Sequence, residues 1–182
     1  SEPLFYQIPT IGEMNRIDDH ESNQLEKEFA EIRAFDRDIR VTSVGTSGFW
    51  VMDMDDEAGQ HNSLFIYTFS KPEDEVKEGR RITLLTGNNQ EYLATTQISF
   101  PTYDVGEDAA ISMPGPSVLP SSMCGATDIL EGYESGLVKL ENVQVPTGFG
   151  SSLSDKDYQD YLSYGQWPVT HGSGCTFYVN SD

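Results

Sequence analysis

The residues most suited to chemistry are the acids of the tract DMDDEAGQHNS, which holds Asp53, Asp55, Asp56 and Glu57. Carboxylates at this spacing are typical of calcium loops, because the EF-hand pattern D-x-[DN]-x-[DN]-G-x5-E takes ligands from alternate positions. Asp53 and Asp55 match the first two positions, but Glu57 takes the third and Ala58 replaces the glycine. The tract therefore predicts a solvated hairpin loop, with a weak Ca2+ site at these four acids as the alternative.

Catalytic chemistry finds little support in the sequence. A catalytic acid or base needs a shifted pKa, and no apolar pocket is evident beside the acidic tract to raise one. His20, His61 and His171 lie far apart in polar contexts, and none stands at metal-ligand spacing from another histidine or a cysteine. The nucleophile motif G-x-S-x-G does not occur. We expect no catalytic residues, no cofactor beyond weakly bound Ca2+, and a protein that is not an enzyme.

The two cysteines indicate the compartment. Cys124 and Cys175 both stand in Gly/Ser-rich contexts, SSMCGA and GSGCTF, where core packing explains a cysteine poorly. We therefore favour one disulfide that closes a long loop over two buried thiols. The chain has no apolar run near the length of a membrane span, and its start at Ser1 resembles a trimmed or mature terminus. We expect an exported protein that is periplasmic, extracellular or an outer-membrane lipoprotein, and a lipid anchor stays open as an alternative.

The charge of the chain limits its partners. There are 30 acidic residues and 11 basic ones, which gives a net charge of −19 and a pI near 4.2. Phosphate-backbone binding gains its affinity from lysine and arginine side chains, so an acidic surface disfavours nucleic acid and anionic membranes. Two interpretations of the negative charge remain open: it keeps the protein soluble in a salty medium, or it forms an acidic surface that binds a basic partner.

Four aromatic residues, Trp50, Tyr67, Tyr92 and Trp167, are candidates for a ligand-stacking platform. Alternation along GFWVMD places Trp50 on the face opposite Phe49, so one of these faces is exposed unless another segment covers it. Exposed aromatic rings on a small barrel bind bases or sugars by stacking, whereas packing in the core or between segments is the plainer explanation. With this net charge, an exposed platform suits a neutral glycan or a protein segment better than DNA.

These candidates lie within a run of short strands. From Ile39 the apolar residues follow period two and are rich in β-branched and aromatic types. Five strands are predicted: IRVTSV, GFWVMDM, NSLFIYTF, RRITLLTG and EYLATTQISF. Turn-forming residues separate them at ordinary loop lengths. The pattern predicts an all-β fold, a five-stranded Greek-key OB barrel.

Regions on either side complete the predicted organisation. An N-terminal arm carries a short helix, which begins at Ser22 and has Leu25, Phe29 and Ile32 at helical spacing. The end of this helix stays open, because Ile32, Ala34 and the residues after them could equally start the next strand. After the barrel comes a proline-rich irregular connection, and then a C-terminal β extension tied by the disulfide. The predicted regions are the arm (1–35), the barrel (36–104), the connection (105–134) and the extension (135–182).

Four motifs resemble a known family: GFWVMD, LFIYT, VKEGRRITLLTG and EYLATTQI. They are similar to the OB-fold module of secreted bacterial nucleases and related bacterial surface proteins and lipoproteins. The chain departs from that pattern at Arg80, where the family usually has Asp, and at Ala94, where it often has Gly. Further along, LEGYESGLVKLENVQV and YGQWPV look like the start of a second OB-like module, which would be incomplete here.

The resemblance implies a function without catalysis in this chain, because in the nucleases the chemistry belongs to a separate metal-dependent domain. We expect a non-catalytic binding or structural module of an exported bacterial protein that recognises a protein or a neutral glycan. Two alternatives stay open: an accessory domain that positions the substrate of a secreted nuclease, and a component of a surface assembly.

Overall fold

The chain folds into two compact units. One, the barrel unit, comprises Ser1–Pro116 and Glu131–Leu137; the other, the C-terminal unit, comprises Ser117–Leu130 and Val138–Asp182. The structure is a computed structural model. It describes residues 8–15, 29–57, 59, 61–92, 95–152 and 155–180.

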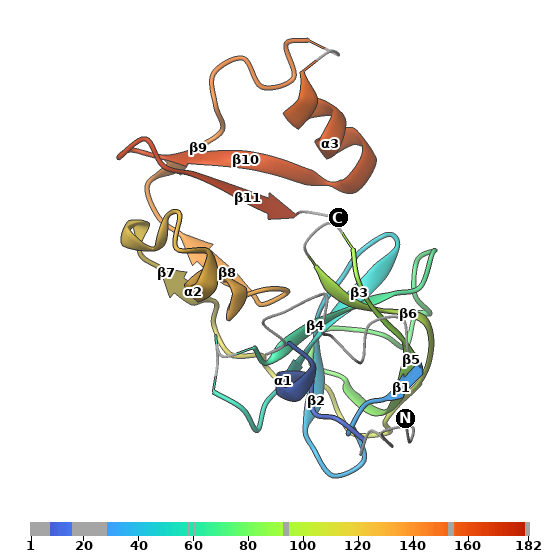
Figure 1. Cartoon of the computed structure of the whole chain (residues 1–182). Helices are drawn as coiled ribbons and strands as arrows, with labels where there is room; N and C mark the ends of the chain where they lie inside the picture. The colour runs from blue at the N-terminus through green and yellow to red at the C-terminus, as the bar shows by residue number, and fades with distance from the viewer. Residues whose placement is uncertain are drawn as a thin grey trace, which may run out of the picture. The chain divides into compact units, whose positions relative to one another are not determined.

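Six strands form the sheet of the barrel unit: β1 (Phe29–Glu31), β2 (Ile39–Val44), β3 (Gly48–Asp53), β4 (Ser63–Tyr67), β5 (Arg81–Glu91) and β6 (Thr96–Val105). Their order is β1-β5-β2-β3-β4-β6, and β5 also pairs with β6, so β2 to β6 close into a barrel (Figure 1). The pairing of β4 with β6 is parallel, and the other pairings are antiparallel. The prediction of an all-β, OB-like barrel of five consecutive strands is confirmed.

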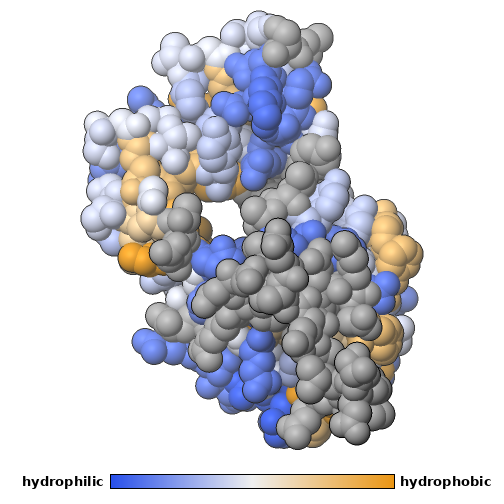
Figure 2. All heavy atoms as spheres, viewed as in Figure 1, coloured by the Kyte–Doolittle hydropathy of each residue, from blue (hydrophilic) through white to orange (hydrophobic). Residues whose placement is uncertain are grey.

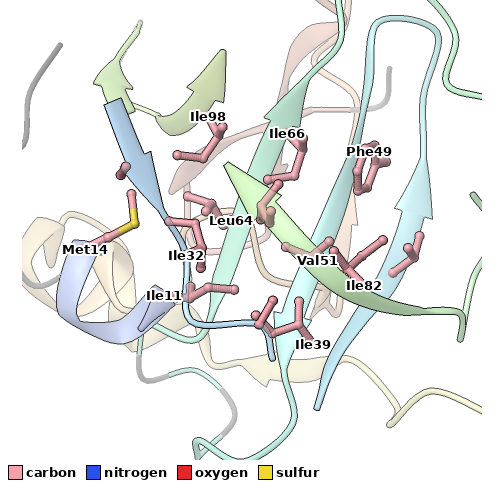
Figure 3. Packing of buried hydrophobic residues seen from close by; sticks show 14 of the residues in the cluster. Ile11, Met14, Ile32, Ile39, Phe49, Val51, Leu64, Ile66, Ile82 and Ile98 are labelled. Carbon is pink, nitrogen blue, oxygen red and sulfur yellow. The ribbon is translucent and has the colours of Figure 1, made fainter. Parts of the chain in front are cut away.

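The barrel encloses one apolar cluster, to which alternate residues of the strands contribute. Phe49 and Val51 of β3, Leu64 and Ile66 of β4 and Ile98 of β6 have no solvent exposure. Figure 3 shows these side chains pointing toward one another from different strands. Residues two apart in a strand share a face, so these apolar residues at alternate sequence positions point into the closed barrel.

A short helix, α1 (Ile11–Asn15), adds to this cluster from outside the sheet. Ile11 and Met14 of the helix are buried and pack with the barrel residues (Figure 3). The helix begins with a capping box, in which the Glu13 amide donates to Thr10 Oγ1 (3.1 Å) and the Thr10 amide donates to the Glu13 carboxylate (2.9 Å). This reciprocal pair lets a helix of so few residues form at the barrel.

The helix predicted from Ser22 is wrong at its C-terminal end. Phe29–Glu31 is strand β1, which pairs antiparallel with β5, and the Ile32 amide donates to the Leu85 carbonyl (2.8 Å). The first part of the predicted helix lies outside the described residues. The hydrogen bonds of β1 to β5 outweigh the helical spacing of the apolar residues. In β1 and the residue after it, Ala30 and Ile32 share one face, and this face is buried in the core.

The C-terminal unit holds short elements: β7 (Ser117–Leu119), η1 (Ser121–Met123), α2 (Thr127–Glu131), β8 (Val138–Leu140), β9 (Val143–Gln144), α3 (Lys156–Tyr164), β10 (Gln166–His171) and β11 (Thr176–Asn180). The last residue of α2 already belongs to the barrel unit. Strands β9, β10 and β11 form one sheet, and β7 pairs parallel with β8. The connection expected to be irregular thus contains a strand and two helical turns.

The disulfide predicted between Cys124 and Cys175 is present, with 6.0 Å between the two Cα atoms. Both cysteines belong to the C-terminal unit, so the bond joins the two segments of that unit. Within the region predicted to be a C-terminal β extension, α3 forms a helix: the Asp155 carboxylate caps its first turn and Gly165, at φ 66°, ends it. Among the described residues, no helix has the length and apolar character needed to cross a membrane.

Candidate functional site

Five aromatic side chains form a continuous line on the outside of the barrel unit, here called the aromatic row: Trp50, Phe65, Tyr67, Phe69 and Phe100. Their ring centroids are 4.6 Å apart for Trp50 and Phe65, and 6.2 Å apart for Phe65 and Tyr67. The spacing is 4.3 Å for Tyr67 and Phe69, and 4.7 Å for Phe69 and Phe100. The row thus brings together rings from three segments of chain.

The register of β3 and β4 aligns the first part of the row. Trp50 lies opposite Phe65, and Gly48 lies opposite Tyr67, so all four residues share the outer face. Gly48 leaves room for the rings, because a Cβ at this position would lie 2.7 Å from the ring of Phe65 and 2.3 Å from the Ile66 carbonyl oxygen. The absence of a side chain at Gly48 of β3 therefore lets the ring of Phe65 lie close to the sheet.

Phe69 follows β4 in an unusual backbone conformation. Its φ is 64°, in the left-handed region that a bulky side chain rarely adopts. Thr68 fixes the turn, because its amide donates to the Ser47 carbonyl (2.9 Å) and its hydroxyl lies 2.6 Å from the Ser70 carbonyl. The ring of Phe69 is 51% exposed, so the turn holds an apolar ring in contact with solvent.

Phe100 reaches the surface through a β-bulge. Thr86 pairs with Thr102 and Asn88 with Ser99, so Gly87 alone faces two residues, Phe100 and Pro101. A bulge of this kind turns a side chain away from its regular direction. Phe100 has φ 50° and is 69% exposed.

Phe69 and Phe100 thus meet through two separate departures from ordinary backbone geometry. Residues held in sparsely populated conformations cost about 1–3 kcal/mol each and cluster at ligand-binding sites. Exposed aromatic rings held in this way by two independent segments need a reason other than packing.

An open groove of about 460 Å³ lies beside the exposed end of the row. It is lined by Thr68, Phe69, Ser70, Lys71, Pro72, Glu73, Phe100, Pro101, Thr102 and Tyr103. Both hydrogen-bond donors and acceptors therefore stand next to the apolar rings. Burial, followed by the negative charge of Glu73, raises the pKa of Tyr103. Figure 2 shows apolar residues in orange at the surface of the barrel unit, along the right-hand edge of the view.

The structure brings together two of the four aromatic residues predicted to bind ligand. Trp50 and Tyr67 belong to the row, on the outer face that alternation predicted for Trp50. Tyr92 is exposed in the turn between β5 and β6, and no ring contact joins it to the row among the described residues. Trp167 belongs to the C-terminal unit.

Sequence reasoning missed three members of the row, Phe65, Phe69 and Phe100. Phe65 could have been found, because it stands two residues before Tyr67 in the same strand and must share its face. Phe69 and Phe100 could not be found this way, since their positions depend on a turn and a bulge that the sequence pattern does not mark.

The acidic tract forms an ion-pair and hydrogen-bond network with Arg37 and Asp38, the two residues that precede β2. Asp53 is fully buried and accepts a hydrogen bond from Arg37 Nε, while Arg37 Nη2 lies 2.7 Å from Asp56 Oδ1. The Asp55 carboxylate accepts from the Asp38 amide (2.9 Å). Burial raises the pKa of Asp53, and the hydrogen bond from Arg37 offsets part of that rise. The tract was expected to be a solvated loop, but Asp53 and Asp56 tie the β3–β4 connection to the start of β2.

The Ca2+ site at Asp53, Asp55, Asp56 and Glu57 stays a prediction that this arrangement does not favour. Arg37 occupies the space between two of the carboxylates, and a cation would compete with it. Across the part of the chain that the structure describes, no three His, Cys, Asp or Glu side chains are grouped as metal ligands.

A second cluster of carboxyl side chains, Glu91, Glu131 and Glu134, connects the segment Glu131–Leu137 to the rest of the barrel unit. Glu134 accepts a hydrogen bond from the Thr96 amide, and the Thr96 hydroxyl lies 3.1 Å from the Glu91 carboxylate. Burial raises the pKa of Glu134 to about 9, with further contributions from a hydrogen bond to Glu131 and from the charges of Glu131 and Glu91. Glu134 is therefore protonated at neutral pH and serves to pair a buried backbone amide.

No protein-family model matches the chain, and no curated protein or solved structure shows significant similarity to it. The resemblance to the OB module of secreted nucleases and surface proteins therefore stays a prediction. The site has to be interpreted from its own geometry.

Proposed function

We propose that this protein is a non-catalytic binding module whose barrel recognises a neutral glycan on the aromatic row. The observation that carries the proposal is the position of the row: its rings lie on the second and third strands of an OB-like barrel, β3 and β4, and end at two exposed phenylalanines. This face of OB folds binds oligosaccharides and oligonucleotides, which is an argument from fold analogy.

The charge selects between these two ligand classes. At a net charge of −19 the protein repels a phosphate backbone, whereas a neutral sugar pays no such penalty. Sugar rings stack their apolar faces on aromatic side chains, and their hydroxyls need donors and acceptors nearby. Ser70, Lys71, Glu73 and Thr102 supply such groups along the groove next to Phe100.

A protein segment is the second candidate, and the exposed end of the row favours it. Phe69 and Phe100 carry no polar atom, so they suit an apolar side chain of a partner as well as a sugar face. A partner that buries both rings would serve a surface assembly, including one made from copies of this chain.

Export at a bacterial surface belongs to the same proposal. The disulfide between Cys124 and Cys175 supports an oxidising compartment, because such bonds persist mainly outside the cytosol. A role as the accessory domain of a secreted nuclease remains the alternative in which the row would stack bases.

Calorimetric titration tests the proposal. The full chain is titrated with neutral β-linked glucan and chitin hexasaccharides, and with single-stranded DNA at physiological salt. The Phe69→Ala, Phe100→Ala double variant is compared with Phe35→Ala, which removes an exposed phenylalanine outside the row. We expect one of the glycans to bind the wild-type chain and the Phe35 variant equally, and the double variant at least tenfold more weakly, a loss of about 1.4 kcal/mol.

Three other results would contradict the proposal that the row binds a glycan. DNA binding that depends on Phe69 and Phe100 would replace the glycan by a nucleic acid and revive the nuclease alternative. Sedimentation velocity tests for self-association of the chain. If the wild type self-associates in a concentration-dependent way and the double variant does not, the ligand of the row is a protein and not a glycan. If the double variant matches the wild type in every titration and in sedimentation, the row has no binding role.

A further inference from the structure

The C-terminal unit contains an aromatic pocket of its own. The pocket has a volume of about 280 Å³, is open to solvent and is lined by Val145, Phe149, Tyr161 and Trp167. All four residues belong to this unit, so the pocket is complete without the barrel. Three of its four walls are aromatic rings.

Helix α3 and the turn after it build two of these walls. Tyr158 and Tyr161 stand one turn apart on α3, with their rings stacked at 6.2 Å and 18° between the planes. Gly165 ends the helix in the left-handed conformation, so that Trp167, at the start of β10, follows within two residues. The third wall, Phe149, meets Tyr158 and Tyr161 edge-on, each at 5.8 Å.

The charges around this pocket favour a cation. The segments Ser117–Leu130 and Val138–Asp182 contain six acidic residues and two lysines. Lys139 pairs with Glu141 at 2.7 Å, and Lys156 pairs with Asp160 at 2.6 Å, so both lysines are already matched by an acid.

Two further acids stand at the start of the helix that carries the tyrosines, outside these two ion pairs. Asp155 caps the first turn of α3, and Asp157 lies one turn before Tyr161. The faces of the aromatic rings add to this negative potential, because a π-system attracts a cation placed over it.

We propose that this pocket receives an arginine or lysine side chain from a basic segment of a protein partner. The aromatic walls bind the apolar stem and the cationic head of such a side chain, and the excess of acidic over basic residues in this unit attracts the rest of the segment. The same acidic surface that repels a polyanion thus becomes the attractive feature for this partner. The site is separate from the aromatic row and does not depend on the proposed glycan binding.

The experiment compares two peptides that differ in charge and not in shape. The full chain is titrated by NMR or calorimetry with a tetra-arginine peptide and with its tetra-citrulline counterpart, in which each guanidinium is replaced by a neutral urea. We expect the arginine peptide to bind and the citrulline peptide to bind at least tenfold more weakly. Tyr161→Leu and Trp167→Leu keep the charge of the protein and are each expected to weaken arginine-peptide binding at least fivefold.

Matched variants separate the pocket from general attraction to an acidic protein. Trp167→Phe keeps an aromatic wall and should restore most of the affinity that Trp167→Leu loses. Phe35→Leu, at an exposed position of the barrel unit outside the aromatic row, should leave the affinity unchanged. Near-ultraviolet circular dichroism confirms that each variant keeps the fold of the C-terminal unit.

Three results would overturn the proposal. Equal affinity of the wild type and the two leucine variants would mean that only the net charge binds the peptide. Equal affinity for the citrulline peptide would mean that the pocket takes neutral side chains. Failure of Trp167→Phe to restore binding in a folded variant would mean that the aromatic character of the wall is irrelevant.

Discussion

The barrel unit and the C-terminal unit are held together in different ways. In the barrel, strands β2 to β6 and α1 all contribute side chains to one cluster, and many of these side chains have no solvent exposure. Among the described residues of the C-terminal unit, the most buried apolar ones are Leu119, Val169 and Phe177, which keep 5–8% exposure. This second unit has a disulfide, as small units without a large core often do.

The difference explains where each unit keeps its exposed rings. The barrel has enough buried apolar surface to hold Phe69 and Phe100 in costly backbone conformations without losing its fold. In the C-terminal unit, Phe149 and Tyr161 remain at the surface because the small sheet has too little area to cover them. Similar aromatic surfaces therefore accompany a large buried core in one unit and a small one in the other.

The largest expected effect tests the core of the barrel. Phe49→Ala removes a fully buried ring, which meets Tyr103 edge-on at 5.0 Å, and is expected to lower the free energy of unfolding by about 4 kcal/mol. Hydrogen exchange of the amides in β3 and β4 measures the loss. Amides of β10 should keep their protection if the two units unfold independently, and a parallel loss there would show that they do not.

Removal of the disulfide tests the other side of the comparison. Cys124→Ser with Cys175→Ser opens a loop with a sequence separation of 51 and is expected to destabilise the C-terminal unit by about 2–4 kcal/mol. Protection of β10 and β11 should fall while that of β3 and β4 stays constant. Unchanged protection of β10 would mean that the small core of this unit suffices by itself.

The pH dependence of stability sharpens the comparison, because the raised pKa of Glu134 belongs to the barrel unit. The folded state keeps a proton that the unfolded chain releases above its ordinary value of 4.5, so the free energy of unfolding falls as pH rises toward about 9. Between pH 6 and 8 we expect a loss of about 2 kcal/mol in urea melts.

Glu134→Gln should remove this fall, because the neutral amide can still accept from the Thr96 amide and donate to Glu131. Glu107→Gln, at an exposed position of the same unit, serves as the control. If both variants keep the wild-type slope, the proton is not held at Glu134.

The smallest effect separates a binding position from a core position. Phe100→Gly relieves a left-handed conformation worth about 1–2 kcal/mol, while glycine costs about 0.5–1 kcal/mol in chain entropy. We therefore expect thermal stability within about 1 kcal/mol of the wild type, in contrast to Phe49→Ala. A loss as large as that of Phe49→Ala would show that Phe100 is there for packing.

Much of the barrel could be predicted from sequence, because each strand buries every second residue and turn-forming residues mark the ends. Phe49 and Val51 inside and Trp50 outside follow from this alternation alone. The disulfide could be predicted as well, since cysteines in Gly/Ser-rich loops have few other structural uses.

The candidate site was less predictable, because it depends on register. The bulge at Phe100 exists only when Gly87 faces it across β5 and β6, and the ion pair of Arg37 with Asp53 exists only when β2 and β3 align. Helix α3 was missed for another reason. It lies in the Ser/Asp-rich stretch SSLSDKDYQDYLS, although Asp155 is a good N-cap and Gly165 a good C-cap.

The path of the chain between the units limits where the protein can be truncated. After Pro116 the polypeptide enters the C-terminal unit, returns at Glu131–Leu137 to seat Glu134 against Thr96, and then leaves again. The chain therefore crosses between the units three times instead of once. A recombinant barrel that stops at Pro116 would lack the segment Glu131–Leu137, and with it the hydrogen bond from the Thr96 amide to Glu134.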